Sequence, residues 1–154
     1  MFFSKGKIDV LLNKTFFASR EVIEGTVVLE LKEPVKSKGV SVSITSQESR
    51  TVRRSGKTES EHYTQSWGSQ SLDIEKEYPA NQRLEYPFKF EAPNLTIPNM
   101  PLPGFLKGLV GAMTPSQKQF KVEAKLEISM GLDVNSHRDI TVAYTKEEEG
   151  KGNI

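Results

Sequence analysis

The stretch Phe120-Lys-Val-Glu-Ala-Lys-Leu-Glu-Ile-Ser-Met130 alternates apolar and polar residues over its whole length. The even positions carry apolar side chains, and the odd positions between them carry Lys, Glu and Ser. A period of two places the first set on one face of a β-strand and the second set on the other. The stretch therefore predicts a strand with one buried and one solvated face, as in an antiparallel sheet covered on a single side.

The same alternation recurs along the chain and predicts further strands at 7–12, 22–32, 40–45, 72–78, 84–91 and 139–144. In the strand 72–78 we expect Leu72 and Ile74 to point inward. Gly25 falls on an inward position, which favours a bulge or a close approach of another backbone. Pro87 lies on an outward position and predicts an edge strand, because proline cannot donate to a ladder. Turns are expected at 13–20, after Glu33-Pro34, at Lys38-Gly39 and near Asn135-Ser136.

Two segments depart from this pattern. Residues 50–57 predict a strand end that runs into a hairpin tip at Ser55-Gly56, and the return limb 58–67 has few apolar residues, so we expect an edge ribbon that projects from the body. Residues 92–118 hold five prolines and predict a long loop. Within that loop, 102–113 is apolar enough for one short helix.

These strands predict an all-β fold: two antiparallel sheets packed face to face in an immunoglobulin-like sandwich. A closed barrel is the main alternative. Helix content should be close to nil outside 102–113. We expect one domain over residues 1–144, followed by a disordered tail at 145–154.

The composition narrows the class of protein. Lys and Arg total 21 against 20 for Asp and Glu in 154 residues, which argues against a nucleic-acid partner. The absence of cysteine excludes disulfides and thiolate chemistry and favours a reducing compartment. No apolar run is long enough for a signal peptide or a membrane span, so we expect a cytoplasmic protein.

Three motifs in order resemble the arrestin-like fold. The first is Gly25-Thr-Val-Val-Leu-Glu-Leu31 with Glu33-Pro-Val-Lys36 and Gly39-Val-Ser-Val-Ser-Ile44, and the second is Leu84-Glu-Tyr-Pro-Phe-Lys-Phe-Glu-Ala-Pro93. The third is Phe120-Lys-Val-Glu-Ala-Lys-Leu126 followed by Gly131-Leu-Asp-Val134. The resemblance covers about residues 7–144 and extends to the bacterial and archaeal sporulation-control-protein type, particularly over 125–142.

The resemblance implies an arrestin-type sandwich that acts as a scaffold or adaptor, since members bind receptors, sorting cargo or regulatory proteins and are not enzymes. Arrestins and most of their relatives carry two such sandwiches, whereas this chain has room for one. The interdomain groove and the polar core of visual-type arrestins are therefore not carried over to any residue here.

Two segments are candidate partner-binding sites. The first is the apolar loop, in which Phe105, Leu106, Leu109 and Val110 would insert into a partner or a membrane surface, while Lys107 would meet an acidic surface. The favoured alternative is that these residues cap one open end of the sandwich, since burying each large apolar side chain contributes roughly 1.5–3 kcal/mol.

The second candidate is the basic run Arg50, Arg53, Arg54 and Lys57, in which the arginine guanidinium groups suit acidic or phosphorylated motifs. The favoured alternative is a solvated hairpin tip, with Glu59 and Glu61 pairing across to the arginines.

Catalytic and metal sites are not indicated. The two histidines, His62 and His137, each lie beside carboxylates, as happens by chance in most chains. No nucleophile elbow or phosphate-binding loop is present. We therefore expect no cofactor, no metal and no enzyme activity, but an adaptor that binds proteins through loops and sheet edges. A peripheral lipid-binding module that uses 102–113, with weak membrane contact, is the alternative, and a homodimer through a free sheet edge is a further hypothesis.

Overall fold

The structure is a computed structural model that describes residues 2–97 and 117–146. The first sheet has the order β1-β2-β4-β8 and consists of β1 (Phe2–Phe3), β2 (Gly6–Leu12), β4 (Val22–Leu31) and β8 (Arg83–Glu91). The second has the order β3-β11-β10-β5-β6, with β7 paired to β5. It consists of β3 (Phe16–Ala18), β5 (Val35–Arg54), β6 (Lys57–Asp73), β7 (Lys76–Tyr78), β10 (Gln117–Ile128) and β11 (Val134–Ala143). A small third sheet pairs β9 (Thr96–Ile97) with β12 (Thr145–Lys146).

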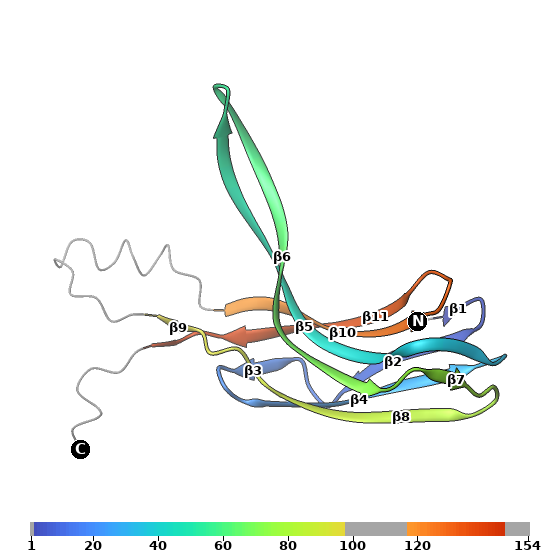
Figure 1. The fold of residues 1–154 in the computed structure, drawn as a ribbon. Coiled ribbons are helices and arrows are strands. Elements are labelled where there is room, and N and C mark those ends of the chain that lie inside the picture. Colours follow the sequence, from blue (N-terminus) through green and yellow to red (C-terminus); the bar gives the residue numbers. More distant parts are fainter. Residues whose placement is uncertain (1, 98–116, 147–154) are drawn as a thin grey trace, which may run out of the picture.

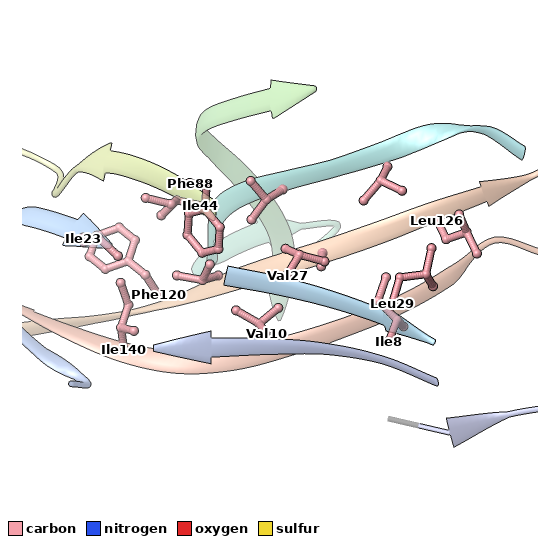
Figure 2. Packing of buried hydrophobic residues seen from close by; sticks show 14 of the residues in the cluster. Ile8, Val10, Ile23, Val27, Leu29, Ile44, Phe88, Phe120, Leu126 and Ile140 are labelled. Carbon is pink, nitrogen blue, oxygen red and sulfur yellow. The ribbon is translucent and has the colours of Figure 1, made fainter. Parts of the chain in front are cut away.

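The two large sheets enclose one apolar core, so the predicted sandwich is confirmed and the closed barrel is not (Figure 1). The inward positions of the alternating strands supply this core, as the period-two pattern requires. Figure 2 shows Val10, Val27 and Leu29 of the first sheet facing the second sheet, which contributes Ile44 and Leu126. The described residues contain strands and turns but no helix, in agreement with the all-β prediction.

Gly25 is the site of the predicted close approach. A Cβ atom added there would lie 2.6 Å from the Leu11 carbonyl oxygen and 2.6 Å from the Phe88 ring. Because Gly25 pairs with Leu12 on one side and Phe88 on the other, a side chain has no space on the inward face. The glycine lets the two neighbouring strands fill the core at this point.

Hydrogen bonds join the two sheets at both of their long sides. Arg138 of β11 donates to the Val10 carbonyl oxygen of β2 at 2.9 Å. On the opposite side, the Tyr86 hydroxyl of β8 donates to Asp73 at the end of β6 at 2.7 Å. Burial raises the pKa of the Asp73 carboxyl, but hydrogen bonds from Tyr86 and Lys76 outweigh it, so the pKa lies below its ordinary value.

Several boundaries differ from the prediction, and the main one concerns the third strand. It begins at Val35 and continues unbroken through Lys38-Gly39, because β10 pairs with Ser37 and Gly39 while β7 pairs with Val35–Ser37. The expected turn there is wrong. Gly39 instead has a φ of 146° and lies at a register irregularity opposite Glu127.

The turn between the last two long strands was also misplaced. Asn135 and Ser136 pair with β10 inside β11, and the turn occupies 129–133 instead. The strand that was predicted to reach Met130 ends at Ile128, and Met130 adopts a left-handed φ of 57° in the turn. The alternation of polar and apolar residues continues through Ser129 and Met130, so it did not mark this end.

Two predicted segments contain different elements from those expected. Within 13–20, residues Phe16–Ala18 form β3, which pairs with β11 in parallel, so the sandwich is not wholly antiparallel. The strand 72–78 is divided between β6 and β7, and Ile74 is 73% exposed in the connection rather than inward.

Two predictions fall, wholly or in part, outside the part of the chain that the structure describes. The short helix near 102–113 lies there, as do residues 147–154 of the predicted tail, although Thr145–Lys146 form β12. Over residues 2–97 and 117–146, no helix has the length and apolar character to cross a membrane.

Candidate partner-binding ribbon

A two-stranded ribbon, formed by 46–54 of β5 and 57–66 of β6, extends beyond the sandwich (Figure 1). The ladder between β10 and β5 stops at the Lys121–Thr45 pair, whereas β5 and β6 remain paired to Arg54 and Lys57. Within the described residues, no third strand pairs with the ribbon. A hairpin of two strands has marginal stability by itself in water, so its attachment to the body must orient it.

A bulge marks the point where the ribbon leaves the body. Ile44 pairs with Gly68 and Thr45 pairs with Ser66, so Trp67 is an extra residue in β6. An extra residue bends its strand, increases the local twist and redirects a side chain. The bulge therefore turns the ribbon away from the sheet and directs the Trp67 indole to the ribbon's base.

The indole anchors a polar cluster at this base. Trp67 Nε1 donates to Ser46 Oγ at 2.7 Å, and Ser46 Oγ donates to Glu48 Oε1 at 3.0 Å. Lys118 of β10 forms an ion pair with Glu48 and lies 5.2 Å from the centre of the Trp67 ring. The edge of Trp67 meets the buried Phe120 ring, with centroids 5.5 Å apart. The cluster thus links both ribbon strands to the core strand β10.

The same contacts determine the charge of Glu48. The hydrogen bond from Lys118 is the largest cause that holds the pKa of the Glu48 carboxyl below its ordinary value. Burial acts in the opposite direction and is outweighed. Glu48 is therefore ionised at neutral pH, and its contacts at the base are charge-assisted.

The tip has the turn that the sequence predicted. Arg54 pairs with Lys57, and Ser55 and Gly56 between them have φ angles of 51° and 75°. Two consecutive positive φ angles define a type I′ turn, which matches the right-handed twist of a hairpin. No atom lies within 4 Å of a Cβ placed on Gly56, so the tip is open to solvent.

The structure separates the predicted basic residues. Alternation along β5 places Arg53 on the opposite ribbon face from Arg54 and Lys57, which lie directly across from each other. Arg54 forms an ion pair with Glu61, as anticipated, whereas Glu59 pairs in the ladder with Val52. The backbone of Arg50 pairs with that of Glu61. The basic run is therefore not one cluster on one surface.

The apolar candidate site is not among the described residues. It comprises Phe105, Leu106, Lys107, Leu109 and Val110, and both docking and core capping by this segment remain predictions, as does the lipid-binding alternative.

The sheet edges differ in how well they are protected against pairing with another chain. β1 and β3 are edge strands of two and three residues. β8 carries Pro87 together with alternating charged residues, which discourages strand addition. β6 has 17 residues without proline, and within the ribbon β5 also has an unpaired edge. Sequence reasoning missed the β5 edge, because only the register shows where β10 stops.

Other hollows and side-chain clusters of the described residues give weaker support for a binding site than the ribbon does. A shallow groove of about 840 Å³ on the first sheet includes Glu24 and Lys89, which pair with each other at 3.3 Å. Among the described residues, no group of three or more His, Asp or Glu side chains is arranged to hold a metal ion. His137 has Asp139 at 3.8 Å, and His62 lies on the ribbon opposite Ser49.

Comparison with known proteins supports the fold. Spo0M, a sporulation control protein from Bacillus subtilis, superposes with a TM-score of 0.65 at 16% identity over 92% of this chain. The chain spans about half the length of that Spo0M chain. The predicted resemblance to the arrestin-like fold and its sporulation-control-protein type is thereby confirmed for the fold.

A second similar structure is the CARDB domain of PF1109 from Pyrococcus furiosus, with a TM-score of 0.42 at 10% identity. It covers 93% of this chain and 98% of that domain. A TM-score of 0.42 is too low to add to the assignment. No family model matches the sequence, and no curated protein matches it significantly.

Proposed function

We propose that the chain is a non-enzymatic adaptor that binds extended segments of other proteins by strand addition to the ribbon. The observation that carries this proposal is the long edge of β6, which continues from the body to the tip and pairs with no further strand of the described residues. An added strand would use main-chain hydrogen bonds for affinity and side chains next to the edge for selectivity. The absence of cysteine favours a reducing, cytoplasmic setting for such an adaptor.

The base of the ribbon supports this function. A receptor strand must keep its edge straight and oriented before the partner arrives, because ordering it on binding reduces affinity. The contacts of Trp67 with Ser46 and of Lys118 with Glu48 supply that orientation. The remaining sheet edges are short or carry proline, so the ribbon is the edge best suited to addition.

The tip favours acidic partner segments. Lys57 lies across from Arg54, and Arg53 presents a further positive charge on the opposite face. Since Arg54 is already paired with Glu61, Arg53 and Lys57 would contribute most of the attraction. Exposed charges act mainly on association rate and are screened by salt, so they would select a partner rather than hold it.

A shortened ribbon tests the proposal. Removing 49–52 together with 59–62 deletes four facing pairs, which preserves the register, the base and the tip. Peptides selected from a random displayed library against the intact chain should bind it and should lose binding to the shortened variant. The shortened variant should retain the unfolding midpoint of the body. Peptides that bind both proteins equally would overturn the proposal.

A charge variant, Arg53→Ser with Lys57→Ser, provides the matched control because it leaves the edge intact. We expect selected peptides to bind it with about tenfold lower affinity at low salt and with a smaller salt dependence. Unchanged affinity would show that the tip does not select acidic segments, while leaving strand addition in place.

A further inference from the structure

The inner edge of the ribbon, at 46–54 of β5, has features that fit a second copy of this chain. β10 covers β5 only as far as Thr45, and beyond this point the two strands diverge. The divergence leaves a hollow of about 280 Å³ that is lined by Thr45, Ser46, Gln47, Gln119, Phe120, Lys121 and Asp139. The unpaired stretch is therefore bounded by this hollow at the base and by the turn at the tip.

Two copies of an edge strand pair antiparallel about a two-fold axis that passes midway between one residue and its equivalent. The stretch from Gln47 to Ser55 has Thr51 at its centre. A register centred on Thr51 places Glu48 opposite Arg54 of the second copy, twice, and Thr51 opposite itself. Cross-strand pairs of opposite charge and pairs of threonine both stabilise sheets.

Neighbouring registers are less favourable. A centre on Arg50 would place Arg50 opposite itself, and a centre on Val52 would place Arg50 opposite Arg54. Like charges directly opposite each other destabilise a sheet. A centre on Ser49 would place Arg53 opposite Thr45, which already pairs with Lys121 of β10. The centre on Thr51 has neither defect.

Charges next to this edge add to the match between the two copies. Glu48 is already paired with Lys118, and Arg54 is already paired with Glu61. Joining Glu48 to Arg54 of the second copy would link these pairs into a row of alternating sign, repeated by the two-fold axis. Networks of this kind contribute more than isolated surface pairs, because each charge has partners on both sides.

The geometry also avoids collision between the bodies. In an antiparallel arrangement the two ribbons point in opposite directions, so the sandwiches lie at opposite ends of the shared sheet. The Ser55-Gly56 tip of one copy would then lie opposite Gln47 and Ser46 of the other, at the hollow between β5 and β10. The hollow is thus the place where the neighbouring tip ends.

We propose that the chain forms a homodimer in which the β5 edges of two ribbons pair antiparallel about Thr51, giving a four-stranded sheet in the order β6-β5-β5-β6. This pairing is independent of partner binding, since it leaves both β6 edges on the outside of the shared sheet.

Disulfide trapping tests the register. The chain has no cysteine, so Thr51→Cys introduces the only thiol. Directly opposed residues of antiparallel strands have Cα separations of about 4.5–5.5 Å, within the range of a disulfide. Ser60→Cys is the matched control, because Ser60 pairs with Thr51 across the ribbon and would lie roughly 14 Å from its equivalent in the dimer.

We expect mild oxidation to convert Thr51→Cys into a covalent dimer and to leave Ser60→Cys monomeric. Crosslinking of Ser60→Cys instead would place the contact at the β6 edge and overturn the proposal. Light scattering that shows the unmodified chain to be monomeric up to about 1 mM would also overturn it.

Charge exchange tests the pairing without relying on a covalent bond. Glu48→Arg alone and Arg54→Glu alone should each weaken the homodimer by about tenfold, because each places like charges opposite one another. An equimolar mixture of the two variants should restore association, since both cross-strand pairs become complementary again. A mixture that stays monomeric, while the unmodified chain dimerises, would overturn the Glu48–Arg54 register.

Discussion

The same two strands, β5 and β6, lie in two different environments along their length. Inside the body, Val40, Val42 and Ile44 of β5 point inward and are at most 1% exposed. Beyond the bulge at Trp67, the same face carries Ser46, which is buried at the ribbon's base beside the Trp67 indole, and then Glu48 and other polar residues, which no second sheet of the described residues covers. A strand can therefore continue well past its core, provided that its side chains change from one-sided to two-sided polarity.

The two regions also depend on different interactions for their order. The body is held by contacts between two apolar faces. Shortening any one of these buried side chains lowers the free energy of unfolding. The ribbon is held by one ladder and by the polar cluster at its base. We therefore expect substitutions in the body to change global stability and substitutions in the ribbon to change local order.

The largest contrast is expected from shortening a side chain in each region. Leu29→Ala removes part of a fully buried core side chain and should lower the free energy of unfolding by about 2–5 kcal/mol. Val52→Ala in the ribbon should change it by no more than about 0.5 kcal/mol. Urea denaturation checks both values. Equal losses would mean that the ribbon is part of the cooperative core.

Substitutions at two glycines, one in the body and one at the ribbon tip, test the same difference. Gly25→Ala forces a methyl group against the Leu11 carbonyl and the Phe88 ring, and it should cost about 1–3 kcal/mol in global stability. Gly56→Ala has open space but an unfavourable φ of 75°, which costs about 1 kcal/mol at the ribbon tip. Thermal unfolding should show a lower midpoint for the first variant and an unchanged midpoint of the body for the second.

The link between Asp73 and Tyr86 predicts how the body responds to acid. The pKa of Asp73 is lowered in the folded state, so its contribution is present above the ordinary value of 3.8 and is lost as the pH falls through the folded pKa. Tyr86→Phe should cost about 1.5 kcal/mol at pH 7 and less in acid. Urea denaturation of both proteins at pH 7 and in acid checks this. A cost that does not depend on pH would contradict it.

The last effect is expected to be confined to the ribbon and its base. Trp67→Phe keeps an aromatic ring but removes the N–H that donates to Ser46, so the ribbon should lose about 1 kcal/mol of local stability while the body is unchanged. Hydrogen exchange should accelerate for amides of 46–66 and remain unchanged in β10 and β4. Uniform acceleration over the whole chain would show that the base stabilises the body and not the ribbon alone.

Much of the fold was readable from local pattern. The period-two alternation located the long strands, and Ser55-Gly56 located the tip, because both signals act over a few residues. The ends of strands were less readable. Lys38-Gly39 and Asn135-Ser136 have the residues of turns, yet both segments lie in strands, because Gly39 pairs with Glu127 of β10 and Asn135 and Ser136 also pair with β10. Tertiary pairing outweighed local preference at both places.

The candidate site, like the fold, was predictable from the sequence only in part. The sequence by itself determined that a polar hairpin with basic residues follows an alternating strand, since side-chain polarity reports whether a face is covered. Only the tertiary structure decided that β10 leaves β5 at Thr45, that Trp67 is the bulged residue and that Lys118 reaches Glu48. These features join residues far apart in the chain, and register between distant strands leaves no mark in the local pattern of either one.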